Sequence, residues 1–221
     1  MGVHILVARP VGIGLERDSV ATYLSAMGRR SHEFCDGWHT GAVRSNRIML
    51  ARNLIADAAL AARGAGITHL LAMDADMQPH LDFLESALDF LTTRDDGDRC
   101  IVGAPYVGGE SEQFQPHVWE IEDGKERRVY RHEVAAREGI LEVGTLGSGL
   151  LLIPTTVFDK VPPPWYEDEY DGIRLKSSCD LSFCRKARGC GVRIYCDWDH
   201  WAGHWQSVCL GKPGTDFLGE A

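Results

Sequence analysis

The chain has 221 residues, of which 44% are hydrophobic and 25% charged, a composition typical of a globular protein rather than a disordered one. Its formal net charge of −9 argues against broad, nonspecific attraction to nucleic acid, which requires many cations at the phosphates. No apolar run approaches the roughly 20 residues that span a bilayer, and no secretion signal opens the chain. We therefore expect a cytoplasmic protein without a transmembrane segment.

Seven cysteines are present, and this odd number favours free thiols in a reducing compartment. None of them forms a C-x-x-C pair, so buried core thiols are favoured over a structural zinc site. His200 and His204 have the spacing of a helical zinc pair, but Gly203 between them disfavours a helix. We expect no zinc site there.

The first half of the chain alternates between strand and helix patterns. Seven elements are expected, with a loop at 37–41: strand 4–8 before Pro10 and a turn at 12–14, helix 18–27, short strand 32–35, helix 43–63, strand 70–73, amphipathic helix 81–91 and strand 100–104. This order predicts an α/β fold with a mostly parallel sheet flanked by helices on both faces.

The pattern changes after Pro105. Five further elements are expected: strands 118–121 and 128–132, which form a hairpin, an apolar strand at 149–153, a helix at 181–188 and a strand at 193–196. Five cations lie between Lys125 and Arg137, where a solvated hairpin is favoured over a nucleic-acid contact. No linker or repeat divides the chain, so we expect one domain over residues 1–221.

Two carboxylates follow the apolar strand at 70–73. Asp74 and Asp76 stand two residues apart at the point where this buried strand ends. Ligands of open α/β sheets collect at the carboxyl ends of the strands. Paired carboxylate oxygens suit Mg²⁺ or Mn²⁺, which usually carries substrate phosphates with it. The sequence therefore predicts a metal–diphosphate site at Asp74 and Asp76.

A second group of polar residues lies near the end of the chain. Asp180 opens the predicted helix at 181–188, where a carboxylate is suited to cap the helix and also to act as a base. His204 lies just beyond the last predicted strand and is the best imidazole candidate.

These residues give the chain a resemblance to nucleotide-sugar-dependent glycosyltransferases of the Rossmann-like GT-A fold, in particular to short phage and bacterial members. The resemblance covers roughly residues 43–105 and 144–204. The matching segments are Arg52-Asn53, Asp74-Ala75-Asp76-Met77, Gly147-Ser148-Gly149-Leu150, Asp180-Leu181-Ser182-Phe183-Cys184, and Asp197 to Gly203-His204.

The resemblance implies a metal-dependent hexosyltransferase that moves a sugar from a nucleoside-diphosphate sugar to an acceptor hydroxyl. Residues 1–105 would bind the nucleotide sugar, and residues 106–221 would bind the acceptor and carry the catalytic residue. Asp180 would be the catalytic base, with inversion favoured over retention. The other implied site residues are Arg9, Pro10, Arg52, Asp74, Ala75, Asp76 and Gly149 around the donor, and Asp74, Asp76 and His204 as ligands of Mn²⁺ or Mg²⁺.

The sequence departs from the family at Cys179, where many members carry an acid, and residues 106–143 have no matching motif. The acceptor is therefore open: a saccharide, a lipid-linked sugar, a protein, or a hydroxymethylated base of phage DNA in the host cytoplasm.

A nucleotidyltransferase would use the same aspartates, but residues 10–18 offer only Arg17 as a cation. A non-catalytic module that stacks sugars or bases on Trp198, Trp201 or Trp205 is the remaining alternative. The oligomeric state is undetermined.

Overall fold

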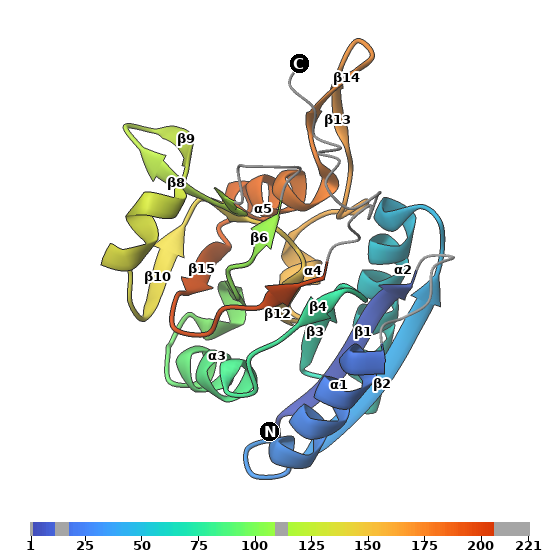
Figure 1. The fold of residues 1–221 in the computed structure, drawn as a ribbon. Coiled ribbons are helices and arrows are strands. Elements are labelled where there is room, and N and C mark those ends of the chain that lie inside the picture. Colours follow the sequence, from blue (N-terminus) through green and yellow to red (C-terminus); the bar gives the residue numbers. More distant parts are fainter. Residues whose placement is uncertain (1, 12–17, 109–114, 206–221) are drawn as a thin grey trace, which may run out of the picture.

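The computed structural model describes residues 2–11, 18–108 and 115–205 (Figure 1). The turn expected at 12–14 and the cation Arg17 lie outside the described residues. Among the helices of the described part, none is both long enough and apolar enough to cross a bilayer.

A seven-stranded sheet forms the centre of the molecule. In spatial order its strands are β10 (Ile140–Val143), β15 (Arg193–Asp197), β5 (Cys100–Gly103), β12 (Leu150–Pro154), β3 (His69–Met73), β1 (His4–Val11) and β2 (Gly37–Arg44). Strands β1, β2, β3, β5 and β15 run in one direction, and β12 and β10 run against them. The expected mixed α/β fold with a mostly parallel sheet is confirmed.

Helices cover both faces of this sheet, as the sequence predicts. The longer helices are α1 (Asp18–Ser31), α2 (Ile48–Ala61), α3 (Phe83–Thr92) and α5 (Cys179–Gly189), and the short ones are α4 (Val157–Lys160), η1 (Ala62–Ala65), η2 (Gly97–Arg99) and η3 (Arg131–Ala136). Helices α2, α4 and α5 pack on one hydrophobic core, and α1 and α3 pack on another. Successive residues of β12 alternate between the two cores, as the period of a strand requires.

The structure corrects the prediction for residues 32–47. The expected strand at 32–35 is a turn, and the expected loop at 37–41 belongs to the edge strand β2. The expected helix at 43–63 begins only at Ile48, because Val43 and Arg44 still pair with β1. The sequence of β2, Gly-Trp-His-Thr-Gly-Ala-Val-Arg, lacks an apolar alternation because an edge strand on the surface needs none.

Small antiparallel sheets complete the C-terminal half. They are β8 (Val118–Glu122) with β9 (Lys125–Arg128) and β11 (Thr145–Leu146), β13 (Glu169–Asp171) with β14 (Arg174–Ser177), β16 (Gly203–His204) with β4 (Met77–Gln78), and β6 (Val107–Gly108) with β7 (Gln115–Pro116). A hairpin with its turn at Asp123-Gly124 is confirmed, with positive φ angles of 50° and 75° at these residues, but its second strand spans 125–128 and not the predicted 128–132. It ends at Arg128, before the short helix η3.

Candidate functional site

The residues Asp74 to Met77 form a turn where β3 leaves the sheet. The backbone N–H of Asp74 donates to the carbonyl of Gly149 at 2.9 Å, and that of Met77 donates to the carbonyl of Asp74 at 3.2 Å. Ala75 and Asp76 occupy the middle of this turn. The turn lies at the carboxyl end of β3. The carboxyl ends of β1 and β5 lie at the same edge of the sheet, because these strands run parallel to β3. This edge is the one at which open α/β sheets bind ligands.

Arg52 of α2 forms an ion pair with Asp74. Its Nη2 lies 2.8 Å from Asp74 Oδ2, and Nη1 donates to the sulfur of Cys179 at 3.4 Å. Burial raises the pKa of the Asp74 carboxyl above its ordinary value, the Arg52 guanidinium opposes that rise, and the Asp76 carboxylate adds to it. The second oxygen of Asp74, Oδ1, is buried without a hydrogen-bond partner among the described residues. Such an oxygen retains the capacity to accept a ligand proton or a cation.

Asp76 meets His204 across 128 residues of sequence. Strand β16 pairs with β4, with His204 opposite Met77, and this register brings His204 Nε2 to 3.3 Å from Asp76 Oδ2. The other ring nitrogen, Nδ1, lies 3.1 Å from the carbonyl oxygen of Val107. The hydrogen bond to Asp76 raises the pKa of His204 above its ordinary value of 6.5. A backbone partner at Nδ1 is the arrangement that leaves Nε2 available to a metal ion.

Asp180 lies at the start of α5 and is buried, with 8% of its surface exposed. It does not cap the helix as expected: the capping position is Ser178, and Asp180 is the second helical residue. Its Oδ1 accepts hydrogen bonds from the Ser178 hydroxyl and, at 3.0 Å, from the backbone N–H of Leu181. The carboxylate acts electrostatically on both Arg52 and Asp74, and the preceding residue, Cys179, accepts a hydrogen bond from Arg52 at its sulfur.

Tyr106 and His117 are site residues that the sequence did not reveal. Their rings stack at 5.1 Å between centroids, and Tyr106 meets the His204 ring edge-on at 5.4 Å. Burial lowers the pKa of His117, and the Asp180 carboxylate opposes that shift. A Cβ at Gly149 would lie 2.8 Å from the Tyr106 ring, so glycine is required there for packing. No spacing pattern connects these residues, because each arises from a different segment.

Two other residues of the predicted donor site, Pro10 and Arg9, and Asn53 of the matching segment Arg52-Asn53 have different surroundings. Pro10 lines a small pocket together with Arg52 and Asp74. Arg9, the preceding residue of β1, lines a separate cavity of about 420 Å³ against α1 and β2. The alternation of side chains along a strand separates the two. Asn53 acts structurally: it accepts the backbone N–H of Trp165 at 2.8 Å and that of Tyr166 at 3.1 Å, and donates to the Tyr166 carbonyl at 2.7 Å.

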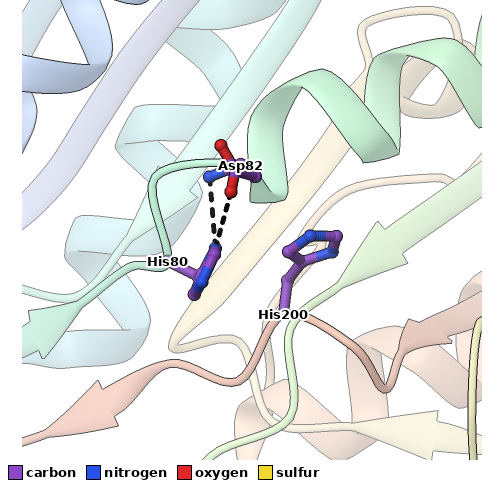
Figure 2. A group of neighbouring side chains, drawn as sticks. All are labelled: His80, Asp82 and His200. Atoms are coloured by element: carbon purple, nitrogen blue, oxygen red, sulfur yellow. Dashed lines mark hydrogen bonds and ion pairs between the residues drawn. The ribbon is translucent and has the colours of Figure 1, made fainter.

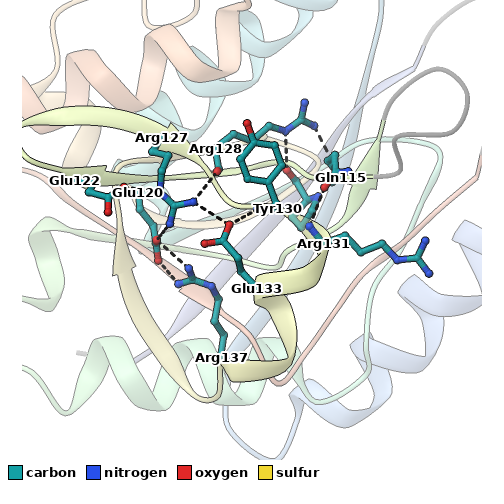
Figure 3. A network of polar contacts seen from close by, with 10 residues as sticks. Gln115, Glu120, Glu122, Arg127, Arg128, Tyr130, Arg131, Glu133 and Arg137 are labelled. Carbon is teal, nitrogen blue, oxygen red and sulfur yellow. Dashed lines mark hydrogen bonds and ion pairs between the residues drawn. The ribbon is translucent and has the colours of Figure 1, made fainter.

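Two of the five cations of residues 125–137, Arg127 and Arg137, form ion pairs with glutamates (Figure 3). Arg127 forms ion pairs with Glu120, Glu122 and Glu133, at 3.4, 2.7 and 2.8 Å. Arg137 is paired with Glu120 as well. These side chains brace the β8–β9 hairpin against η3, so the solvated-hairpin interpretation fits them better than a phosphate-binding patch.

The possible metal ligands at the sheet edge fit a hard divalent cation. Such ions are commonly held by one or two protein carboxylates together with substrate phosphates and water. Asp76 and His204 face one another, and the unpartnered Oδ1 of Asp74 lies on the same turn. Among the described residues, the only three metal-ligating side chains whose ligand atoms lie within 4.8 Å of one another are His80, Asp82 and His200, at a different place.

No protein-family model matches the chain, and no curated protein matches it in sequence. Solved structures do match. A197 from STIV has a TM-score of 0.61 at 16% identity, over 93% of this chain and 87% of that one. GalNAc-T7, solved with UDP, GalNAc and Mn²⁺, has a TM-score of 0.51 at 13% identity, over 92% of this chain and 44% of that one.

A Bacillus anthracis protein named for glucose-1-phosphate thymidylyltransferase activity is similar as well. It has a TM-score of 0.50 at 10% identity, over 90% of this chain and 88% of that chain. Identities this low establish the fold alone. The chain therefore has a GT-A-like, Rossmann-like α/β fold, which glycosyltransferases and nucleotidyltransferases share.

Proposed function

We propose that this protein is a metal-dependent glycosyltransferase that uses a nucleoside-diphosphate sugar. The pairing of Asp76 with His204 at the carboxyl end of β3, beside the buried pair of Asp74 with Arg52, carries this proposal. GalNAc-T7, which has the same fold, was solved with UDP, GalNAc and Mn²⁺, and it supports a sugar nucleotide and a divalent cation as ligands.

Asp76 and His204 would hold Mn²⁺ or Mg²⁺, with Asp74 on the same turn. Bound there, the cation would supply charge neutralisation to the departing diphosphate. Arg52 would keep Asp74 ionised in its buried position by its 2.8 Å ion pair. The donor set of carboxylate oxygens and one imidazole nitrogen is compatible with either ion, and with Mn²⁺ in particular because of the nitrogen.

Asp180 would accept the proton of the acceptor hydroxyl. The bond between the sugar and the diphosphate breaks, the bond between the sugar and the acceptor oxygen forms, and the diphosphate keeps the electron pair. A carboxylate placed for this proton transfer contributes roughly 10²–10⁴-fold in rate. A general base of this kind corresponds to transfer with inversion, and the burial of Asp180, next in sequence to the Cys179 that contacts Arg52, supports its place near the reacting centre.

The metal assignment is tested by donor binding. A panel of UDP-, GDP- and dTDP-sugars is screened by thermal shift with and without Mn²⁺, and we expect one donor to stabilise the protein only when the ion is present. A ligand at a hundred times its dissociation constant adds about 2.7 kcal/mol. Asp76→Ala should lose this shift, whereas Asp57→Ala, at an exposed position of α2, should keep it. Undiminished Mn²⁺-dependent binding by Asp76→Ala contradicts the assignment.

The role of Asp180 is tested separately. Asp180→Asn should bind the donor with near wild-type affinity while transfer to water or acceptor falls by roughly 10²-fold or more. The Asn side chain still accepts the N–H of Leu181, so the helix start is preserved. Transfer at the wild-type rate would remove Asp180 as the base.

Nucleotidyl transfer is the second candidate, because the fold also matches the Bacillus anthracis protein over 88% of that chain. The same aspartates would then hold a metal on a nucleoside triphosphate. Incubation with labelled sugar 1-phosphate and each nucleoside triphosphate separates the two activities. Pyrophosphate release with formation of a sugar nucleotide favours the second candidate, and release of nucleoside diphosphate from a sugar nucleotide favours the first.

The acceptor is proposed to be a saccharide or another carrier of a free hydroxyl rather than duplex DNA. The overall charge of −9 opposes approach to a polyanion, and Arg127 and Arg137 are already paired with glutamates. Trp201 lines an apolar cavity of about 580 Å³ together with Val107, whose carbonyl contacts His204. An aromatic wall this close to the site suits a sugar ring.

A further inference from the structure

His80, Asp82 and His200 converge at a place separate from the Asp76–His204 pair (Figure 2). One ligand atom from each residue lies within 4.8 Å of the other two. The imidazole centroids of His80 and His200 are 5.0 Å apart, with their planes inclined at 55°. His80 and Asp82 belong to the connection between β4 and α3, and His200 belongs to the connection between β15 and β16.

A buried carboxylate holds the His200 ring. His200 Nδ1 lies 2.8 Å from Asp197 Oδ2, and the Asp197 side chain is only 1% exposed. The same oxygen accepts the Ser86 hydroxyl at 2.8 Å, and Asp197 Oδ1 accepts the backbone N–H of Asp199 at 3.2 Å. With Nδ1 donating to a fixed carboxylate, the lone pair of His200 is on Nε2. Histidine ligands of metal ions are oriented in this way by carboxylates.

Asp82 and His80 are also held in place. The backbone N–H of Asp82 donates to His80 Nδ1 at 3.2 Å. Arg30 engages Asp82 Oδ1 at 2.5 Å, which leaves Oδ2 on the histidine side, 3.7 Å from His80 Nδ1. Glu85, at 3.4 Å from Arg30, offsets part of the guanidinium charge that would otherwise oppose a cation. The side chains of His80 and Asp82 are about half exposed, so an ion can reach them from solvent.

We propose that His80, Asp82 and His200 bind a Zn²⁺-type transition-metal ion. Two imidazole nitrogens and one carboxylate oxygen, with a water molecule as the fourth ligand, make a tetrahedral set that suits Zn²⁺. Two nitrogen ligands disfavour Mg²⁺, which prefers oxygen. The three ligand atoms need to move only a short distance to coordinate one ion, because they already lie within 4.8 Å of one another.

The ion would join the two connections that flank the β4–β16 ribbon. His80 lies two residues after β4, and His200 lies three residues before β16. Asp76 directly precedes β4, and His204 lies in β16. A metal clip at this position would therefore brace the ribbon that brings Asp76 to His204. The proposed ion is structural, and its binding does not depend on sugar transfer.

Calorimetric titration of the chelator-treated full-length protein with Zn²⁺ tests the site. The titration is made on the His204→Ala background, which removes the histidine of the other candidate site. We expect this background to bind one equivalent of Zn²⁺. Adding His80→Ala or Asp82→Asn should weaken that binding at least tenfold, whereas adding His132→Ala, an exposed histidine of η3, should not.

Two further measurements keep the test independent of folding. Circular dichroism of the metal-free variants should match that of the parent, because His80 is exposed, and Zn²⁺ should raise the unfolding temperature of the parent but not of the His80→Ala variant. Co²⁺ in place of Zn²⁺ should give the visible spectrum of tetrahedral coordination in the parent alone. Equal Zn²⁺ affinity in the parent and in both the His80→Ala and Asp82→Asn variants, or no binding by the parent, would overturn the proposal.

Discussion

Replacement of Arg52 by methionine tests how the site tolerates a buried carboxylate. The side chains of Arg52 and Asp74 are 12% and 22% exposed, and their ion pair measures 2.8 Å. Methionine keeps most of the aliphatic volume of Arg52 and removes the charge. Removing one partner of a buried pair costs about 3–5 kcal/mol, because the other charge remains in place without compensation. We expect a loss in that range for Arg52→Met at pH 7.5.

The loss should depend on pH. Asp74 has a pKa above its ordinary value of 3.8, raised by burial and held down by Arg52, so the variant should raise this pKa further. Between the unfolded and the folded pKa, the folded state then binds more protons than the unfolded state. The stability of the variant therefore increases as the pH falls through that window, and each unit of pKa shift corresponds to about 1.4 kcal/mol.

Urea unfolding at pH 7.5 and at pH 5, analysed at constant m-value, measures both effects. Arg63→Met is the matched control, since Arg63 pairs with Asp159 on the surface, where such pairs contribute about 0–1 kcal/mol. The double variant Arg52→Met/Asp74→Asn should recover most of the loss, because no buried charge remains. The reasoning is refuted if Arg52→Met costs no more than the control, or if its cost is the same at both pH values.

Two other predictions follow from single contacts. In an NMR titration, the pKa of His204 should lie above 6.5 and should fall in the Asp76→Asn variant. The affinity for Mn²⁺ should rise as the pH rises through that pKa, because the proton competes with the ion for the imidazole. A wild-type pKa below 6.5 contradicts this prediction. Asn53→Ala removes three hydrogen bonds to residues 165–166 and should lower the free energy of unfolding in urea by about 2–4 kcal/mol. The exposed Asn46→Ala is the control and should lower it by about 0.5 kcal/mol or less. Equal losses in the two variants would exclude a structural role for the Asn53 hydrogen bonds.

Periodicity revealed most of the sheet and its helices. The run at 70–73, the amphipathic pattern at 81–91 and the strand at 193–196 are correct because a buried strand or helix must present apolar residues at its own period. The same reasoning failed at β2, where an edge strand of polar and small residues carries no such pattern. Capping was misassigned by two residues, because Ser178 and Asp180 are both residue types that favour a helix start.

Only part of the candidate site could be predicted from the sequence. Asp74 and Asp76 could be predicted, since an acidic pair that ends a buried strand has a defined place at the sheet edge. The contacts of these carboxylates had no signal in local spacing: the resemblance alone implied that Arg52 and His204 belong to the site, and they reach it from another helix and from a ribbon 128 residues away. The glutamates that pair with Arg127 also become evident only in the folded chain.

The amino-acid sequence by itself determined the α/β class, the strand that ends in Asp74 and the acidic turn that follows, because these depend on neighbouring residues and on local periodicity. Only the tertiary structure decided that β12 runs antiparallel between β3 and β5, that His204 faces Asp76, and that His80 approaches His200. Such pairings join segments far apart in the chain. Their free energy comes from contacts that exist only once the chain has folded.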